Sequence, residues 1–66
     1  MTDYLVTYKL QEDDGVWRRV FVRVDGHRRE RTRMEADRYM ASRYSGKFWL
    51  FERGPFPARA QERAEN

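Results

Sequence analysis

The chain has 66 residues, a charged fraction of 38%, an aromatic fraction of 15% and a formal net charge of +3. A chain of this length builds one domain, since at this size only about 60% of the unfolded surface is buried on folding, and that leaves little core to spare for an enzymatic cleft. The absence of cysteine excludes disulfides and thiolate metal sites, and no apolar run is long enough for a membrane span or a signal peptide.

The first two predicted elements are strands of a hairpin. Residues 3–11 and 16–24 alternate side chains with a period of two and are rich in β-branched and aromatic residues, which is typical of strands. Asp14 and Gly15 between them favour a type I′ turn, whose two central residues need positive φ. The row of the second strand that we expect in the core consists of Val20, Val22 and Val24.

A helix is predicted after a polar segment. Residues 27–31 are too polar for a core element and are expected to form a loop or a short edge strand. Thr32 and Glu35 have the spacing of a capping box, which predicts a helix over residues 33–44, and Gly46 is placed to end it in the left-handed conformation. The buried stripe of this helix is predicted to contain Ala36, Met40 and Tyr44.

Residues 47–53, KFWLFER, predict a third strand. We expect Phe48 and Leu50 to face the core. Gly54 and Pro55 are predicted to end the strand, because proline has no backbone N–H to donate to a sheet ladder.

The element order is therefore β-β-α-β. A right-handed connection through the helix carries the third strand past the first to its far edge, which predicts a three-stranded antiparallel sheet in the order 2-1-3 with one helix on one face. We expect a single α+β domain over residues 1–54 and a polar, disordered tail over residues 55–66.

The other face of this sheet is predicted to be unusual. In the stretch VWRRVFVRV, the residues that alternate with the core valines are aromatic or positively charged. Each large aromatic side chain can bury 150–250 Å², so four of them offer on the order of 600–1,000 Å², above the roughly 300–600 Å² of the largest apolar patch on an ordinary monomer. The predicted face contains Trp17, Arg19, Phe21, Arg23, Lys47, Trp49, Phe51 and Arg53.

Aromatic rings interleaved with arginines favour nucleic-acid binding. Bases stack on the rings, at about 1–3 kcal/mol per base, while guanidinium groups neutralise the phosphates. Residues 18–33 hold seven arginines against two acidic residues, so the positive charge is concentrated in the middle of the chain. Further phosphate contacts are expected from Arg28, Arg29, Arg31 and Arg33.

Three other interpretations of this face stay open. A small regulator or inhibitor, of the kind that phages and mobile elements encode, would use it to dock on a larger protein; a homodimer would bury it, since Trp, Phe and Arg are also enriched in interfaces. Arginine stems and Phe56 of the tail would otherwise cover it within one chain. An inverted register would bury Arg19 and Arg23 at a cost of several kcal/mol each, and we do not favour it. A twist at one end of the sheet that brings Trp17 or Trp49 to the edge of the core stays open.

No catalytic constellation is evident in the sequence. His27 has no partner at a recognisable spacing, and the acidic cluster formed by Glu12, Asp13 and Asp14 is explained by a polar turn. We therefore expect a cytoplasmic, non-enzymatic protein with no cofactor, metal site or membrane contact, whose partner is nucleic acid or a larger protein.

Overall fold

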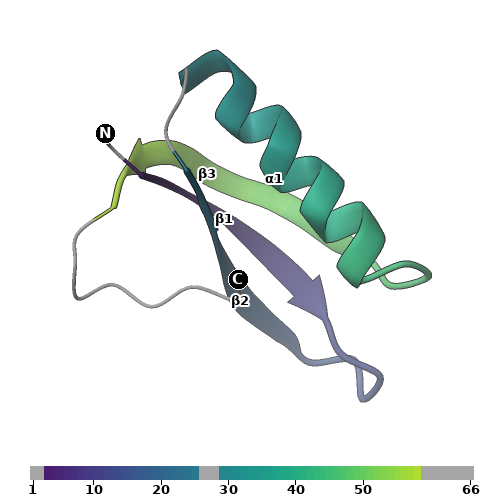
Figure 1. The fold of residues 1–66 in the computed structure, drawn as a ribbon. Coiled ribbons are helices and arrows are strands. Elements are labelled where there is room, and N and C mark those ends of the chain that lie inside the picture. Colours follow the sequence, from purple (N-terminus) through teal and green to yellow (C-terminus); the bar gives the residue numbers. More distant parts are fainter. Residues whose placement is uncertain (1–2, 26–28, 59–66) are drawn as a thin grey trace.

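The computed structural model describes residues 3–25 and 29–58, which form a three-stranded sheet and one helix (Figure 1). The elements follow in the order β1 (Tyr4–Gln11), β2 (Trp17–Val24), α1 (Arg29–Arg43) and β3 (Trp49–Pro57). Both β2 and β3 run antiparallel to β1, and the strand order is β2-β1-β3. The predicted α+β fold, its β-β-α-β order and its sheet topology are confirmed.

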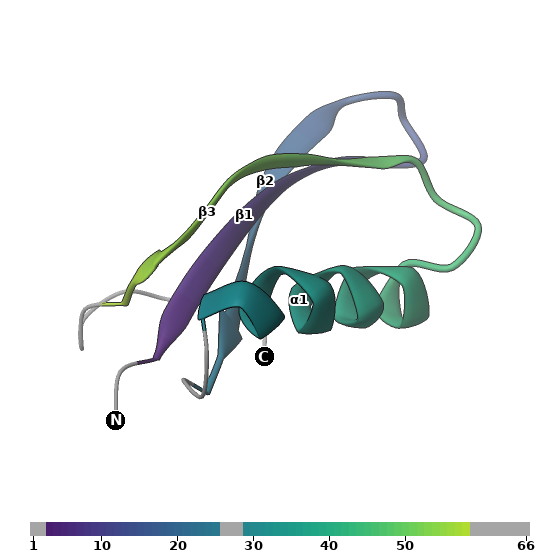
Figure 2. The same ribbon diagram turned by 90° about the horizontal axis from the view of Figure 1, so that it is seen from above.

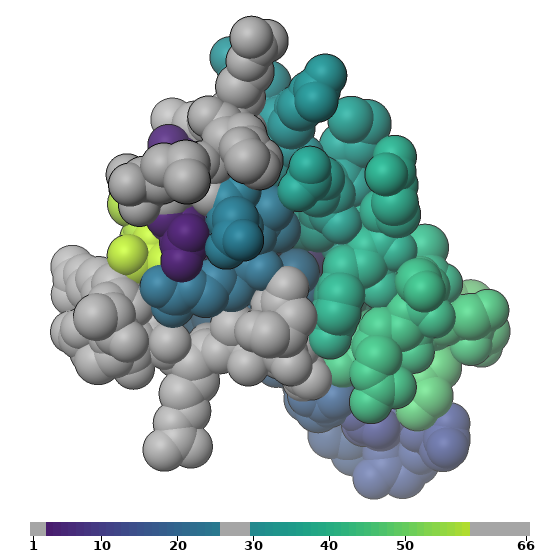
Figure 3. All heavy atoms as spheres, in the orientation of Figure 1, coloured from purple at the N-terminus to yellow at the C-terminus, as the bar shows by residue number. Residues whose placement is uncertain are grey.

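The sheet is curved, and α1 lies against one side of it (Figure 2). Within the described part of the chain, no second helix or strand covers the opposite side. In the space-filling view, α1 covers much of the near face, while the hairpin between β1 and β2 projects beyond it (Figure 3). The molecule therefore has a helix face and an open face.

The core lies between the sheet and α1. Alternate residues of β1 and β2 point into it, and α1 contributes a stripe with a spacing of four residues, as the sequence predicts. Burial of these apolar side chains is the main force that holds the helix on the sheet. The core consists of Val6, Tyr8, Leu10, Val20, Val22, Val24, Ala36, Met40 and Tyr44.

The helix begins four residues before the predicted start. Thr32 is 1% exposed and lies inside α1, so the predicted capping box is wrong. Thr32 occupies the position one turn before Ala36 on the buried stripe, and the arginines and glutamate that precede it are good helix formers. At the other end, Gly46 has a φ of 83° and the Lys47 N–H donates to the Tyr44 carbonyl at 3.1 Å, which confirms the predicted glycine end.

The hairpin loop differs from the predicted type I′ turn. Gly15 has a φ of 87°, whereas no described non-glycine residue has a positive φ, so Asp14 is not left-handed. The Glu12 N–H donates to the Val16 carbonyl at 2.8 Å and the Gly15 N–H to the Glu12 carbonyl at 2.9 Å. These bonds define a three-residue loop that ends in a left-handed glycine.

Strand β3 begins later and ends later than predicted. It continues through Gly54 and Pro55 to Pro57, and its pairing with β1 shifts register on either side of Thr7. Proline is tolerated because β3 is an edge strand, whose outer N–H groups have no ladder partner. The sheet thus extends past the predicted domain boundary at residue 54, while residues 59–66 of the predicted tail lie outside the described residues.

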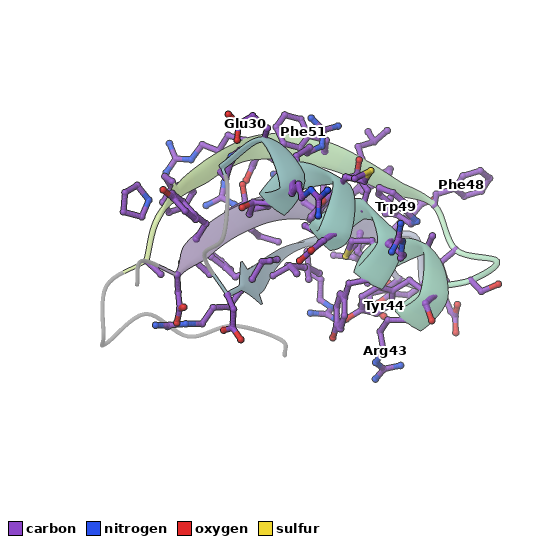
Figure 4. The ribbon with its side chains drawn as sticks, turned by 45° about the horizontal axis from the view of Figure 1, so that its top comes forward. Glu30, Arg43, Tyr44, Phe48, Trp49 and Phe51 are labelled. Carbon is purple, nitrogen blue, oxygen red and sulfur yellow. The ribbon has the colours of Figure 1, made fainter. Side chains whose placement is uncertain are left out.

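The facing of β3 is the opposite of the prediction. Trp49 packs against the core, with its ring centroid 5.4 Å from that of Tyr8, and the Phe51 ring lies 6.1 Å from the same tyrosine. Phe48 and Leu50, expected in the core, are 75% and 60% exposed. Figure 4 shows Phe48 directed away from the body of the molecule and Trp49 between β3 and α1.

Candidate binding face

The open face is organised in rungs that run across the three strands. Residues directly opposite each other in antiparallel strands share a face, so the pairing of Lys9 with Arg19 and with Leu50 makes one rung of three side chains. Gln11 pairs with Trp17, and its N–H donates to the Phe48 carbonyl at 3.0 Å, which makes the rung nearest the hairpin. The remaining rungs contain Phe21, Thr7 and Arg53, and Arg23, Leu5 and Phe56.

Strand β2 contributes the residues that the sequence predicts. Its valines are buried against α1, so Trp17, Arg19, Phe21 and Arg23 point to the open face. Trp17 is 42% exposed and Phe21 is half-buried. The alternation of β2 therefore places two aromatic rings and two guanidinium groups on one surface.

Strand β3 contributes other residues than those predicted. Trp49 and Phe51 belong to the helix face, and Phe48 and Leu50 take their places on the open face. The open face keeps its aromatic and aliphatic character through this exchange. Its exposed apolar residues gather near the hairpin end, where Trp17 and Phe48 flank Gln11 and Leu50 lies in the next rung.

Glu52 is a residue of this face that sequence reasoning missed. Its carboxylate oxygens lie 2.7 Å from Arg19 Nε and 3.8 Å from Lys9 Nζ, so it reaches from β3 across β1 to a side chain of β2. The hydrogen bond from Arg19 lowers the pKa of Glu52, with a smaller contribution from the Thr7 hydroxyl. Glu52 alternates with Leu50, so the correct facing of β3 would have identified it.

The other cations near the open face also have partners. Arg23 Nε lies 3.0 Å from Asp3 Oδ2, and the Arg53 guanidinium carbon lies 5.6 Å from the Phe56 ring centroid. The face carries four cations, Lys9, Arg19, Arg23 and Arg53, against the carboxylates of Asp3 and Glu52. The face is basic, and three of its four cations, Lys9, Arg19 and Arg23, have carboxylate partners within the chain.

Several predicted site residues lie elsewhere. Arg33 belongs to α1, where its guanidinium carbon lies 3.4 Å from the Phe51 ring centroid and its Nε lies 3.1 Å from Asp37 Oδ1. Lys47 lies 3.7 Å from both Glu12 and Asp13 at the hairpin end. Arg31 is exposed on α1, Arg29 begins that helix, and Arg28 and His27 lie outside the described residues. The described members of this arginine cluster therefore sit on the helix that covers the other side of the sheet.

The described residues offer no arrangement that holds a metal. Within residues 3–25 and 29–58, no group of three or more His, Cys, Asp and Glu side chains comes together in this way. In the same part of the chain, α1 lacks the length and apolar character needed to cross a bilayer. No family model matches the chain, and no curated protein or solved structure is detectably similar to it.

Proposed function

We propose that this protein is a non-enzymatic binding module that binds single-stranded nucleic acid through its open face. The observation that carries the proposal is the placement of Trp17, Phe21 and Phe48 on the same side of the sheet as Lys9 and Arg19, the side away from α1. Aromatic rings stack with bases of any sequence, and nearby cations neutralise the phosphates.

The spacing along β2 supports this function. Alternate residues of a strand are about 7 Å apart, so Arg19 stands between Trp17 and Phe21 at roughly that distance from each. A phosphate that joins two bases stacked on these rings would meet the Arg19 guanidinium. Lys9, the neighbour of Arg19 on β1, would provide a second positive charge at the same level.

Glu52 occupies the position that a phosphate would take. It neutralises Arg19 and Lys9 in the free protein, so binding replaces one anion by another. Replacing Glu52 by the uncharged Gln should therefore raise the affinity for nucleic acid several-fold. An unchanged or weaker affinity of Glu52→Gln would show that these two cations do not contact phosphates.

Fluorescence anisotropy with a labelled mixed-sequence single-stranded oligonucleotide tests the proposal. Two to four phosphate contacts predict that log affinity falls with log salt with a slope of about −1.4 to −2.8. Trp17→Ala should weaken binding about ten-fold or more, because a stacked base contributes about 1–3 kcal/mol. Met34→Ala, an exposed position on α1, is the control; absence of binding at low salt and micromolar protein contradicts the proposal.

A second candidate function is docking on a larger protein, as a small cytoplasmic regulator such as a phage would encode. The observation that favours it is that Arg19, Lys9 and Arg23 already have carboxylate partners, while Phe48 and Leu50 are the most exposed apolar residues of the face. The lack of cysteine fits the reducing cytoplasm. Capture of one protein by the wild type and not by Phe48→Ala, with no binding of the oligonucleotide, would favour this function.

A further inference from the structure

The two outer edges of the sheet differ. The β3 edge has two register shifts and contains Pro55 and Pro57, and bulges and prolines are among the devices that prevent an edge from pairing with another strand. Strand β2 pairs with β1 over eight residues without a shift and contains neither proline nor glycine. In the described part of the chain, its other edge has no strand beside it. The β2 edge is therefore the regular one, and its geometry suits pairing with a further strand.

The hydrogen bonds of the hairpin identify which groups of β2 face outward. The Glu12 N–H donates to the Val16 carbonyl, and every second residue pair along an antiparallel ladder repeats this arrangement. The backbone groups of Val20 therefore bond to Tyr8 on β1. Those of Arg19 and Phe21, one residue to either side, point away from the sheet.

The outward-pointing residues of β2 form a self-complementary series. They read Trp17, Arg19, Phe21, Arg23, so aromatic and cationic side chains alternate. When this series is laid antiparallel on a copy of itself with the two-fold axis at Val20, Arg19 lies opposite Phe21 and Trp17 lies opposite Arg23. Each rung then pairs a guanidinium with a ring, an attractive arrangement.

The neighbouring registers are less favourable, because they place arginines opposite each other. An axis at Phe21 places Arg19 opposite Arg23, and an axis at Arg19 places that arginine opposite itself. Like charges directly opposite each other in a sheet are destabilising. With the axis at Val20, the rungs of the helix face bring valine to valine at the centre and avoid any pair of arginines.

We propose that the partner of the β2 edge is β2 of a second copy, paired antiparallel about Val20 to form a continuous six-stranded sheet. This assembly goes beyond the proposed function and does not depend on it. A two-fold interface of this kind uses the same patch on both chains, and the added strand supplies main-chain hydrogen bonds to the outer edge of β2. It also joins the two open faces side by side.

The first test measures mass against concentration. A single strand pair buries little area, so the association is expected to be weak. Sedimentation equilibrium should give a mass that rises from 8.1 kDa toward twice that value between about 1 µM and about 1 mM protein. A mass that stays at one chain over this range overturns the proposal, whatever the outcome of the oligonucleotide titration.

The second test fixes the register. The chain has no cysteine, so a single introduced thiol can cross-link only to its copy. Val20 would face Val20 of the second chain in a non-hydrogen-bonded pair with Cα atoms about 4.5 Å apart, which suits a disulfide. Val20→Cys should give a cross-linked dimer on non-reducing electrophoresis after mild oxidation, and Phe21→Cys much less; the reverse result overturns the proposed pairing.

Charge at residue 21 provides a matched pair of variants. Phe21→Arg places one arginine opposite Arg19 of the other copy in each of the two symmetry-related rungs and should weaken association about ten-fold. Phe21→Glu creates an ion pair in each of these rungs and should preserve or strengthen association. Leu50→Arg, on β3 and far from the β2 edge, is the control that should leave the mass unchanged. Equal effects of the two Phe21 variants would show that Arg19 of a second copy does not lie opposite.

Discussion

Tyr8 is the residue that ties the three parts of the fold together. It is fully buried on β1, its ring contacts Trp49 and Phe51 edge-on, and its hydroxyl donates to Asp37 Oδ1 on α1 at 2.6 Å. Burial raises the pKa of Tyr8 above its usual range, with a further contribution from the Asp37 hydrogen bond. A single side chain thus joins both the central strand and the edge strand to the helix.

Tyr8→Phe should therefore lower the free energy of unfolding. The loss of one hydrogen bond to a carboxylate predicts a cost of about 1.5–3 kcal/mol, measurable by urea denaturation. Tyr39→Phe is the control, because Tyr39 lies on α1 and packs against the same core, and it should cost less.

The stability that depends on Tyr8 should also vary with pH. Because folding raises the pKa of Tyr8, this stability is complete below about pH 10 and decreases as the pH rises further. Tyr8→Phe should weaken this loss of stability at alkaline pH.

Glu52 gives a prediction on the acid side. Its folded pKa is lowered by Arg19, so its contribution to stability is present above the pKa of an unfolded Glu, about 4.3, and is lost as the pH falls through the folded value. The thermal midpoint of Glu52→Gln should fall less than that of the wild type between about pH 5 and pH 2. Glu35→Gln, exposed on α1, is the matched control. Parallel midpoint curves for wild type and Glu52→Gln would contradict the role of this ion pair.

At the scale of elements, β3 shows why the facing of a strand is not always readable. Phe48, Trp49, Leu50 and Phe51 are all apolar, so either alternate set can fill a core. Strand β2 is different, because one of its two sets includes Arg19 and Arg23, whose burial is costly. The prediction succeeded for β2 and was wrong for β3 for this reason.

The observed facing of β3 predicts unequal effects of truncation. Phe51→Ala removes a ring that contacts Tyr8 and Arg33 and should lower the free energy of unfolding by about 1.5–3 kcal/mol, while Phe48→Ala should change it by about 0.5 kcal/mol or less. Chemical denaturation of the two variants measures the difference. Equal losses would contradict the observed facing, and a larger loss for Phe48→Ala would indicate the facing predicted from the sequence.

The C-terminal half of β3 also illustrates a local rule overridden by the rest of the structure. Gly54 has a φ of 112°, and a Cβ there would lie 2.7 Å from the Leu5 carbonyl oxygen. Only glycine allows the backbone of β3 to pass this close to β1. The dipeptide that signals a strand end in the sequence therefore serves as a bend within the strand.

At the scale of the whole molecule, the residues that form the core and the residues that we propose for binding lie on different faces of one sheet. The two tryptophans of the chain divide between them: Trp49 packs on the core and Trp17 is on the open face. A small domain has one core, so the residues that hold α1 are concentrated on one side. The other side is the one that we propose for binding a partner.

This division predicts opposite behaviour of two chemically identical substitutions. Trp49→Ala should lower the thermal midpoint strongly. Removing a fully buried large side chain lowers the free energy of unfolding by about 3–5 kcal/mol, and Trp49, which is partly buried against the core, should lose a substantial part of that. Trp17→Ala should leave the midpoint within about 4 °C of the wild type while weakening oligonucleotide binding. Calorimetry and anisotropy on both variants measure the two effects; a large midpoint loss in Trp17→Ala would contradict a separate binding face.

The sequence by itself determined the element order, the sheet topology, the facing of β2 and the glycine end of α1. Each depends on a local pattern with one acceptable solution, such as valines that alternate with arginines. Only the tertiary structure decided the facing of β3, the earlier start of α1 and the position of Glu52. Residues 48–51 are all apolar, so the packing of Trp49 and Phe51 on Tyr8 decides their facing. In the same way, Thr32 is placed by its burial in the core side of α1, and Glu52 is placed by the cations that it contacts.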